Sequence, residues 1–134
     1  MKKTYHGSCH CGTVRFECGH DLAEDTSKCN CSMCTRTRFW KTIARADAFR
    51  LLQGEDALAD YQFGGNAIHY PFCSRCGVKP FGSGDMEELG GRFYAINVAC
   101  LDDAMDEELA QAPVTHEDGR NDRWGQAPAE TRYL

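Results

Sequence analysis

The spacing of the cysteines constrains this chain more than any other feature of its sequence. Seven of its nine cysteines fall into three short runs, which read Cys9-His10-Cys11, Cys29-Asn30-Cys31-Ser32-Met33-Cys34 and Cys73-Ser74-Arg75-Cys76-Gly77. In a Cys-x-x-Cys-Gly step, the two intervening residues let both sulfurs face one ion, and the glycine relaxes the turn behind them. A Cys-x-Cys step can do the same at the tip of a hairpin. The runs therefore predict bound metal, and thiolates favour zinc.

Seven thiols do not complete two four-coordinate sites, so their number favours one site of four and one site of three. The group of three, here called the open cluster, lies within six residues: Cys29, Cys31 and Cys34. The group of four, here called the closed cluster, joins two distant pairs: Cys9, Cys11, Cys73 and Cys76. A saturated site of four cysteines is structural, whereas a catalytic zinc needs a vacant position. We therefore predict a structural zinc in the closed cluster and a catalytic zinc in the open cluster.

Other uses of these cysteines are open at this stage. The open cluster could hold a second structural zinc, completed by His69, His116 or another distant residue. A thioredoxin-like redox role for the last pair is disfavoured, because no helix-forming run follows Gly77. Cys18 and Cys100 lie in or beside strand-like segments, and we interpret both as small buried hydrophobic residues.

Charge and hydropathy exclude several classes of protein. The chain of 134 residues has a net charge of -5, which removes the attraction on which most nucleic-acid binding depends. No run approaches the ~18 apolar residues of a membrane-spanning helix, and no apolar stretch follows the first residues as in a secretory signal. We therefore expect a cytoplasmic protein without nucleic-acid or membrane partners. In that compartment, clustered cysteines more often hold metal than form disulfides.

Short strand-like segments separated by glycine turns predict a fold that is mainly β. The length fits a single domain over residues 1–134, and no repeat or linker divides it. The predicted strands are Thr13–Cys18, Phe39–Ala44, Leu58–Phe63, Ala67–Phe72 and Arg92–Ala99. The first of them follows a glycine and two cysteines, which indicates a hairpin with these cysteines at its tip.

One short helix is predicted, from Asp102 to Ala112. Carboxylates crowd its first half, where the positive end of the helix dipole favours them, and Pro113 stops it. We interpret this helix as a solvated flank without a chemical role. The polar stretch from Val114 to Leu134 lacks periodicity and indicates an extended tail laid over the domain.

A basic run follows the open cluster in this otherwise acidic chain. Between Cys34 and Asp47 there is no acidic residue, and four residues are basic: Arg36, Arg38, Lys41 and Arg45. Cations near a thiolate lower its pKa, and an arginine fork suits carboxylates. Arg36 and Arg38 are therefore candidates to bind an anionic thiol substrate. The alternative is an ordinary solvated strand face.

These motifs together resemble the family of glutathione-dependent formaldehyde-activating enzymes, which also includes centromere protein V. The resemblance spans nearly the whole chain. It depends on three motifs in order: Gly7–Phe16 (GSCHCGTVRF), Cys29–Cys34 (CNCSMC) and Phe72–Gly77 (FCSRCG). Further matching positions are Asn97–Asp102, Pro113, His116 and Trp124.

The resemblance implies a β-tent fold, in which zinc staples short antiparallel sheets and hairpins together. It implies two zinc ions per chain, a structural one in the closed cluster and a labile one in the open cluster. The implied activity is condensation of formaldehyde with glutathione to S-(hydroxymethyl)glutathione, which is a carbon-sulfur lyase reaction. The segment Val78-Lys79-Pro80-Phe81 departs from the family pattern, because many relatives carry a threonine and then a small residue or histidine there.

On this reading, zinc in the open cluster acts as Lewis acid and template, so that a thiolate sulfur attacks the aldehyde carbon at neutral pH. Two alternatives compete with it. One is a related lyase or thiol-handling enzyme that acts on another small molecule. The other is a non-catalytic binding module, in which both zinc ions only stabilise the fold.

Overall fold

The chain forms short strands with little helix, as predicted. The structure is a computed structural model that describes residues 1–134. The strands are β1 (Lys3–Ser8), β2 (Arg15–His20), β3 (Thr26–Cys29), β4 (Trp40–Arg45), β5 (Phe49–Gln53), β6 (Leu58–Tyr61), β7 (Ile68–Cys73), β8 (Phe81–Met86), β9 (Gly91–Asn97) and β10 (Val114–Glu117). The helices are α1 (Ser32–Thr37) and α2 (Asp106–Gln111). Neither helix has the length and apolar character needed to cross a membrane.

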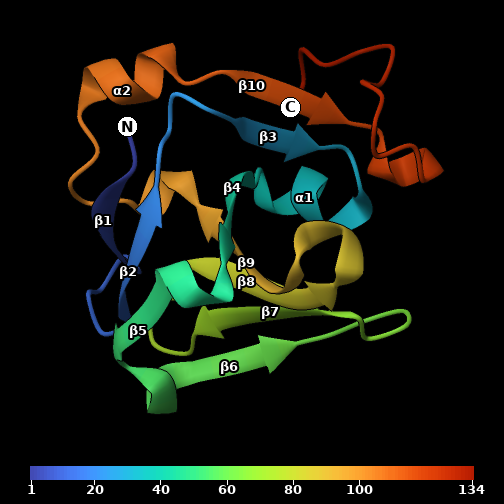
Figure 1. Cartoon of the computed structure of the whole chain (residues 1–134). Coiled ribbons are helices and arrows are strands. Elements are labelled where there is room, and N and C mark those ends of the chain that lie inside the picture. Colours follow the sequence, from blue (N-terminus) through green and yellow to red (C-terminus); the bar gives the residue numbers. More distant parts are fainter.

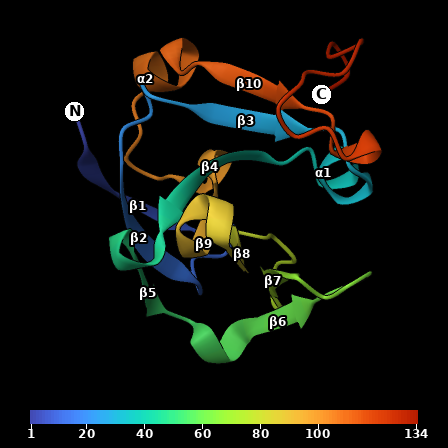
Figure 2. The same ribbon diagram turned by 45° about the vertical axis from the view of Figure 1, so that its right-hand side comes forward.

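The strands build two sheets. The larger sheet has seven strands in the order β10-β3-β4-β9-β8-β7-β6, and the smaller has three in the order β1-β2-β5. Neighbouring strands are antiparallel except β10, which runs parallel to β3. Figure 1 shows β10 and β3 at one end of the molecule and β6 and β7 at the other, with β1 and β2 at the side. The view in Figure 2 keeps this separation between the two ends.

Aromatic side chains from both sheets meet in the core. Phe16 on β2 and Phe49 on β5 stack with their ring centroids 5.7 Å apart. Phe49 also contacts Phe81 on β8, at 4.8 Å, and Tyr94 on β9, at 3.9 Å. Such pairs add about 0.5–1.5 kcal/mol each beyond the burial of their area. This cluster therefore holds the smaller sheet against the middle of the larger one.

The predicted strands are all present, with ends shifted by a few residues. The segment Thr13–Cys18 corresponds to β2 (Arg15–His20), which pairs with β1 over the full length of both strands. Cys9 and Cys11 lie in the connection between these two strands. The prediction of a hairpin with cysteines at its tip is therefore confirmed.

The predicted extent of the helix was wrong at its start. Helix α2 begins at Asp106, four residues later than expected, and Met105 precedes it as the N-cap. The carboxylate of Asp102 accepts a hydrogen bond from Ser8 Oγ at 2.7 Å, and Asp103 accepts one from the backbone amide of His6 at 2.9 Å. These two carboxylates anchor the chain to β1 instead of lying in the first turn of a helix.

Two further expectations need correction. The molecule has two α-helices where one was predicted, because Ser32–Thr37 within the open-cluster region forms α1. The segment after Pro113 is also not simply an extended tail, because Val114–Glu117 forms β10. Its register pairs Glu117 with Cys29, so this late segment lies directly beside the open cluster.

Candidate metal sites

The closed cluster gathers its four thiols from two connections of the fold. The sulfurs of Cys9, Cys11, Cys73 and Cys76 all lie within 4.8 Å of one another. The Sγ atom of Cys11 is 3.7 Å from that of Cys9 and 3.7 Å from that of Cys73. A tetrahedral ion with metal-sulfur bonds of about 2.3 Å places its sulfurs about 3.8 Å apart. The spacing therefore fits one tetrahedral ion.

Tight backbone turns present these thiols. Gly77 N donates to Cys73 O at 2.7 Å, and Gly77 has a φ of 79°, a conformation that glycine adopts without strain. In the other connection, Gly12 N donates to Cys9 O at 3.3 Å, and Val14 N donates to Cys9 Sγ at 3.3 Å. Each pair therefore forms a compact knuckle. One knuckle joins β1 to β2 and the other follows β7, so an ion between them links the two sheets.

Local hydrogen bonds also favour ionised sulfur in the closed cluster. Hydrogen bonding with Thr13, whose Oγ1 lies 3.1 Å from Cys11 Sγ, lowers the pKa of Cys11 to about 6. The backbone amide of Val78 lowers the pKa of Cys76. Burial, in contrast, raises the pKa of Cys73. A bound cation would overcome this effect of burial, because metal ligation deprotonates cysteine.

The open cluster is local in the sequence, and its three thiols come from one strand end and one helix start. Cys29 ends β3, Cys31 is the N-cap of α1, and Cys34 lies in the first turn of that helix. Their sulfurs lie within 4.8 Å of one another, and no further cysteine, histidine or carboxylate joins them at that distance. Backbone amides donate to two of the sulfurs at 3.3 Å, from Cys31 to Cys29 and from Cys34 to Cys31.

The pKa shifts of the three thiols in the open cluster are those of a group that would bind a cation. Hydrogen bonding with the Cys29 and Cys34 thiols, together with backbone amides, lowers the pKa of Cys31. Hydrogen bonding with Cys31 raises the pKa of Cys29, and contacts with Cys29 and Cys31 raise that of Cys34. One thiolate is thus stabilised at the expense of the other two. Three thiolates can lie together only with positive charge among them, so the group fits a divalent metal ion.

The two histidines considered as a fourth ligand have other positions. His69 on β7 is half exposed, and its Nδ1 lies 2.6 Å from Asp60 Oδ2. His116 lies on β10 opposite Lys28 in the parallel register. Neither belongs to the group formed by the three thiols. The open cluster therefore offers three protein ligands.

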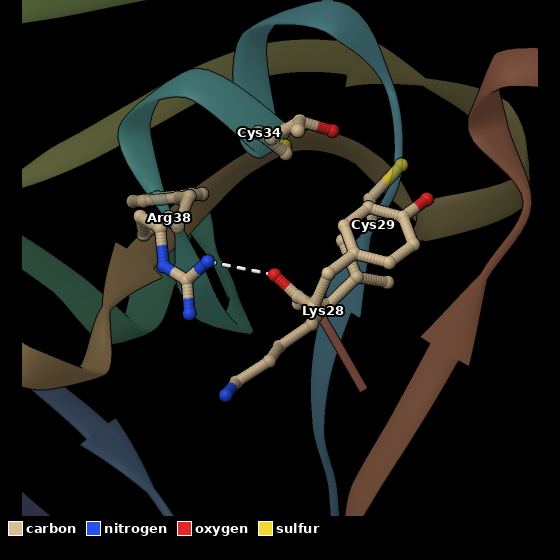
Figure 3. Close-up of a pocket in the computed structure, with 8 residues that line it drawn as sticks. Lys28, Cys29, Cys34 and Arg38 are labelled. Atoms are coloured by element: carbon tan, nitrogen blue, oxygen red, sulfur yellow. Dashed lines mark hydrogen bonds between the residues drawn. The ribbon is translucent and has the colours of Figure 1, made fainter. Parts of the chain in front are cut away.

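A small cavity adjoins the open cluster. It measures about 10 Å³, room for one molecule of the size of water. Eight residues line it, from the end of β3, from α1 and from the end of the chain: Lys28, Cys29, Cys34, Thr35, Arg38, Phe39, Tyr133 and Leu134. Figure 3 shows the Arg38 guanidinium turned toward a carbonyl oxygen and the Lys28 ammonium turned away from Cys29. That carbonyl belongs to Tyr133, at 2.6 Å from Arg38 Nη1.

The structure distributes the basic run over different surroundings. Arg38 is exposed and lines the cavity. It is also the C-cap residue of α1. Arg36 donates to Ser32 O of its own helix at 3.0 Å. Lys41 donates to Ser27 Oγ at 2.8 Å and forms an ion pair with Glu117 at 2.5 Å. Its charge is therefore neutralised within the larger sheet. Arg38 is the member of the run that lies at the open cluster.

Several residues that support the open cluster were not identified from the sequence. Asn30 is buried, and its amide donates to Asp118 Oδ1 at 2.8 Å, while its own oxygen accepts from Arg120 N at 2.9 Å. These bonds dock the chain after β10 against the open cluster. The sequence places Asn30 between two candidate ligands, but its hydrogen-bond partners lie 88 and 90 residues later in the chain.

Gly119 makes the closest contact with the open cluster from this late segment. A Cβ atom at this position would lie 2.5 Å from Cys29 Sγ and 2.7 Å from the Trp124 ring. We expect Gly119→Ala to displace Cys29 and to weaken metal binding at the open cluster by about tenfold or more, as changes in groups that orient ligands commonly do. Competition with a chromophoric chelator would measure this loss.

Gly125→Ala is the matched control for this substitution. It is the same change six residues later, where a Cβ atom would have no heavy atom within 4 Å. We expect this variant to bind metal as the wild type does. Equal metal binding by both variants would show that the contact between Gly119 and Cys29 is unimportant.

The fold and the two cysteine groups define a class: a small, mainly β protein with two sites that could hold metal ions. The family model for glutathione-dependent formaldehyde-activating enzymes matches residues 4–117. The chain belongs to this family. It is also similar to a solved structure described as a Rhodobacter sphaeroides protein, with 31% identity and a TM-score of 0.67. That match covers 82% of this chain and 99% of the other.

Proposed function

We propose that the chain is a zinc-dependent carbon-sulfur lyase that condenses formaldehyde with glutathione to S-(hydroxymethyl)glutathione, or that acts on a closely related thiol. The family is named for activation of formaldehyde that depends on glutathione. The observation that carries the proposal is the open cluster, which offers three thiols and no fourth protein ligand beside a cavity. A closed structural site has no such arrangement.

The proposal assigns one zinc ion to each cysteine group. The four thiols of the closed cluster would hold an ion that links the two sheets. The three thiols of the open cluster would hold the second ion, which when bound supplies a Lewis acid and a template for the reacting groups. The backbone amides of Cys31 and Cys34 orient two of these sulfurs.

In this proposal the cavity binds formaldehyde, and Arg38 binds glutathione. The proposal places formaldehyde, the smaller substrate, at this cavity because Cys29 and Cys34 line it. Glutathione is far larger, so most of it must lie on the solvent side, where Arg38 is exposed. The guanidinium of Arg38 would bind a carboxylate of glutathione there and bring its sulfur toward the open cluster. Because Arg38 now donates to Tyr133 O, a carboxylate would replace this neutral acceptor with a charged one.

The test is to follow the reaction of formaldehyde with glutathione by NMR exchange, with and without zinc-loaded protein. We expect the protein to accelerate formation of S-(hydroxymethyl)glutathione above its spontaneous rate. We also expect Arg38→Met to raise KM for glutathione about tenfold or more, since a charge-assisted hydrogen bond contributes about 1.5–3 kcal/mol. KM for 2-mercaptoethanol, which has no carboxylate, should not change.

Arg45→Met is the matched control, because Arg45 belongs to the same basic run but does not line the cavity. A similar rise in KM for both variants would assign the effect to general charge and would exclude a specific role for Arg38. No acceleration by the zinc-loaded wild type would refute the proposed activity. It would leave two alternatives: a related lyase or thiol-handling enzyme that acts on another small molecule, and a binding module in which both ions are structural.

A further inference from the structure

Lys79 is partly buried, and its ammonium lies out of reach of solvent without a hydrogen-bonding partner. It belongs to the connection between β7 and β8, three residues after Cys76. Its Nζ atom is buried from solvent and has no hydrogen-bond partner. Lysine is rarely buried unless another group compensates its charge. An unpaired buried ammonium therefore requires an explanation.

Two aromatic rings account for part of the environment of this ammonium. The Nζ atom lies 3.7 Å from the centroid of the Phe39 ring and 4.8 Å from that of Tyr70. The faces of aromatic rings attract cations, most strongly where water is excluded. Phe39 also lines the cavity beside the open cluster. The rings therefore hold the ammonium next to the candidate catalytic site.

The thiols of the open cluster influence both Lys79 and Tyr70 electrostatically. Burial raises the pKa of Tyr70 to about 12, and the charges of Cys31, Cys34 and Cys29 add to this effect. Burial lowers the pKa of Lys79, while the charges of Cys34 and Cys31 act in the opposite direction. Tyr70 therefore lies within electrostatic reach of all three sulfurs, and Lys79 within reach of those of Cys31 and Cys34. Lys41 is the cation that opposes Lys79, and it is paired with Glu117.

The open cluster keeps a net negative charge even with a divalent ion bound, and Lys79 is the nearby cation whose ammonium is buried. Three thiolates carry three negative charges, and a divalent ion supplies only two positive ones. One negative charge is left in a partly buried place, where an uncompensated charge is unfavourable. The single positive charge of Lys79 brings this total to zero.

We propose that Lys79 is a positioning residue, whose buried ammonium supplies the counter-charge that lets the open cluster hold a divalent ion as three thiolates. This inference depends on the proposed function only in assigning zinc to the open cluster. It predicts that the second ion binds more weakly when the charge is removed. It also predicts that zinc affinity depends on the charge of Lys79. If Lys79 only packed against the two aromatic rings, removing its charge would not change zinc affinity.

The test is the dissociation constant of each zinc ion in protein loaded with two ions, measured by competition with a chromophoric chelator in the absence of substrates. Lys79→Met removes the charge and keeps an unbranched, flexible side chain. We expect it to weaken binding of the second ion by about 10–100-fold, the range seen when groups that support metal ligands are removed. Binding of the ion in the closed cluster should not change, which also reports that the variant is folded.

Lys28→Met is the matched control. Lys28 also lines the cavity, but its ammonium points away from Cys29 (Figure 3). Its Nζ atom lies over the Trp40 ring, 5.8 Å from the centroid, so we expect little change in zinc affinity from this variant. Lys79→Arg, which keeps the charge, should bind the second ion more tightly than Lys79→Met does.

Three outcomes would overturn the inference: wild-type affinity in Lys79→Met, an equal loss in Lys28→Met, or an affinity in Lys79→Arg no better than in Lys79→Met. The proposed function can fail separately. A wild type that binds two zinc ions without accelerating the reaction would refute the activity, and the zinc affinities would still decide the role of Lys79.

Discussion

Replacing Cys73 with serine is expected to unfold most of the protein at room temperature. Cys73 is fully buried and contributes one of the four sulfurs of the closed cluster. Without it, the knuckle after β7 no longer shares an ion with the hairpin of β1 and β2. In zinc-finger peptides, binding of a structural zinc supplies about 10–16 kcal/mol. The whole stability of an ordinary domain is about 5–15 kcal/mol, so loss of this ion removes a comparable amount.

The length of chain that the ion joins adds to this effect. The closed cluster brings Cys11 next to Cys73, 62 residues apart in the sequence. Closing a long loop restricts the unfolded chain more than closing a short one does. An ion in the closed cluster would thus restrict the chain in the way that a disulfide does in a secreted protein. Circular dichroism and thermal melting of the purified variant, together with its zinc content, would measure the loss.

Cys100→Ser is the matched control for this prediction. Cys100 is partly buried, and burial raises its pKa to about 11, but it belongs to neither cysteine group. The same exchange of sulfur for oxygen there should lower the melting temperature only modestly and leave two zinc ions in place. If Cys73→Ser and Cys100→Ser melt alike, the closed cluster does not stabilise the fold.

The two cysteine groups could be predicted from the sequence because their chemistry is local. Each knuckle needs only two cysteines at short spacing, and the numbers of thiols suggest how they are shared. Helix α1 could not be predicted in this way, because six residues are too few to show a helical period. Its N-cap is a cysteine, Cys31, whose sulfur accepts from Cys34 N. Cys31 and Cys34 therefore serve both as candidate metal ligands and as residues of the first turn of α1.

Long-range contacts explain the other differences between prediction and structure. Asp102 and Asp103 match the start of a helix in sequence, but Ser8 and His6, more than 90 residues earlier, bind their carboxylates. The pairing of β10 with β3 likewise joins segments that share no local pattern. Lys79 was missed for a related reason. Charged groups are usually exposed, and only the fold reveals that the Nζ atom of this lysine is buried.

Replacing Cys31 with serine is expected to abolish the proposed activity without unfolding the protein. A serine hydroxyl is a poor ligand for zinc beside two thiolates, so the second ion should be lost. Serine is also a favoured N-cap, so α1 should keep its start. The open cluster spans only six residues, and its ion restricts little of the unfolded chain. We therefore expect a folded protein that binds one zinc ion and melts close to the wild type.

The expected loss of activity is large. A Lewis acid contributes several kcal/mol to the stabilisation of charge in a transition state, and each 1.36 kcal/mol changes a rate about tenfold. The rate of formaldehyde condensation above the spontaneous reaction should thus fall by about a hundredfold or more. The measurements are NMR exchange with glutathione, zinc content and thermal melting, with Cys100→Ser as control. A Cys31→Ser variant that lost the second zinc but kept its rate would show that the open cluster is not the catalytic site. Unfolding together with loss of both ions would show that the two cysteine groups are not structurally independent.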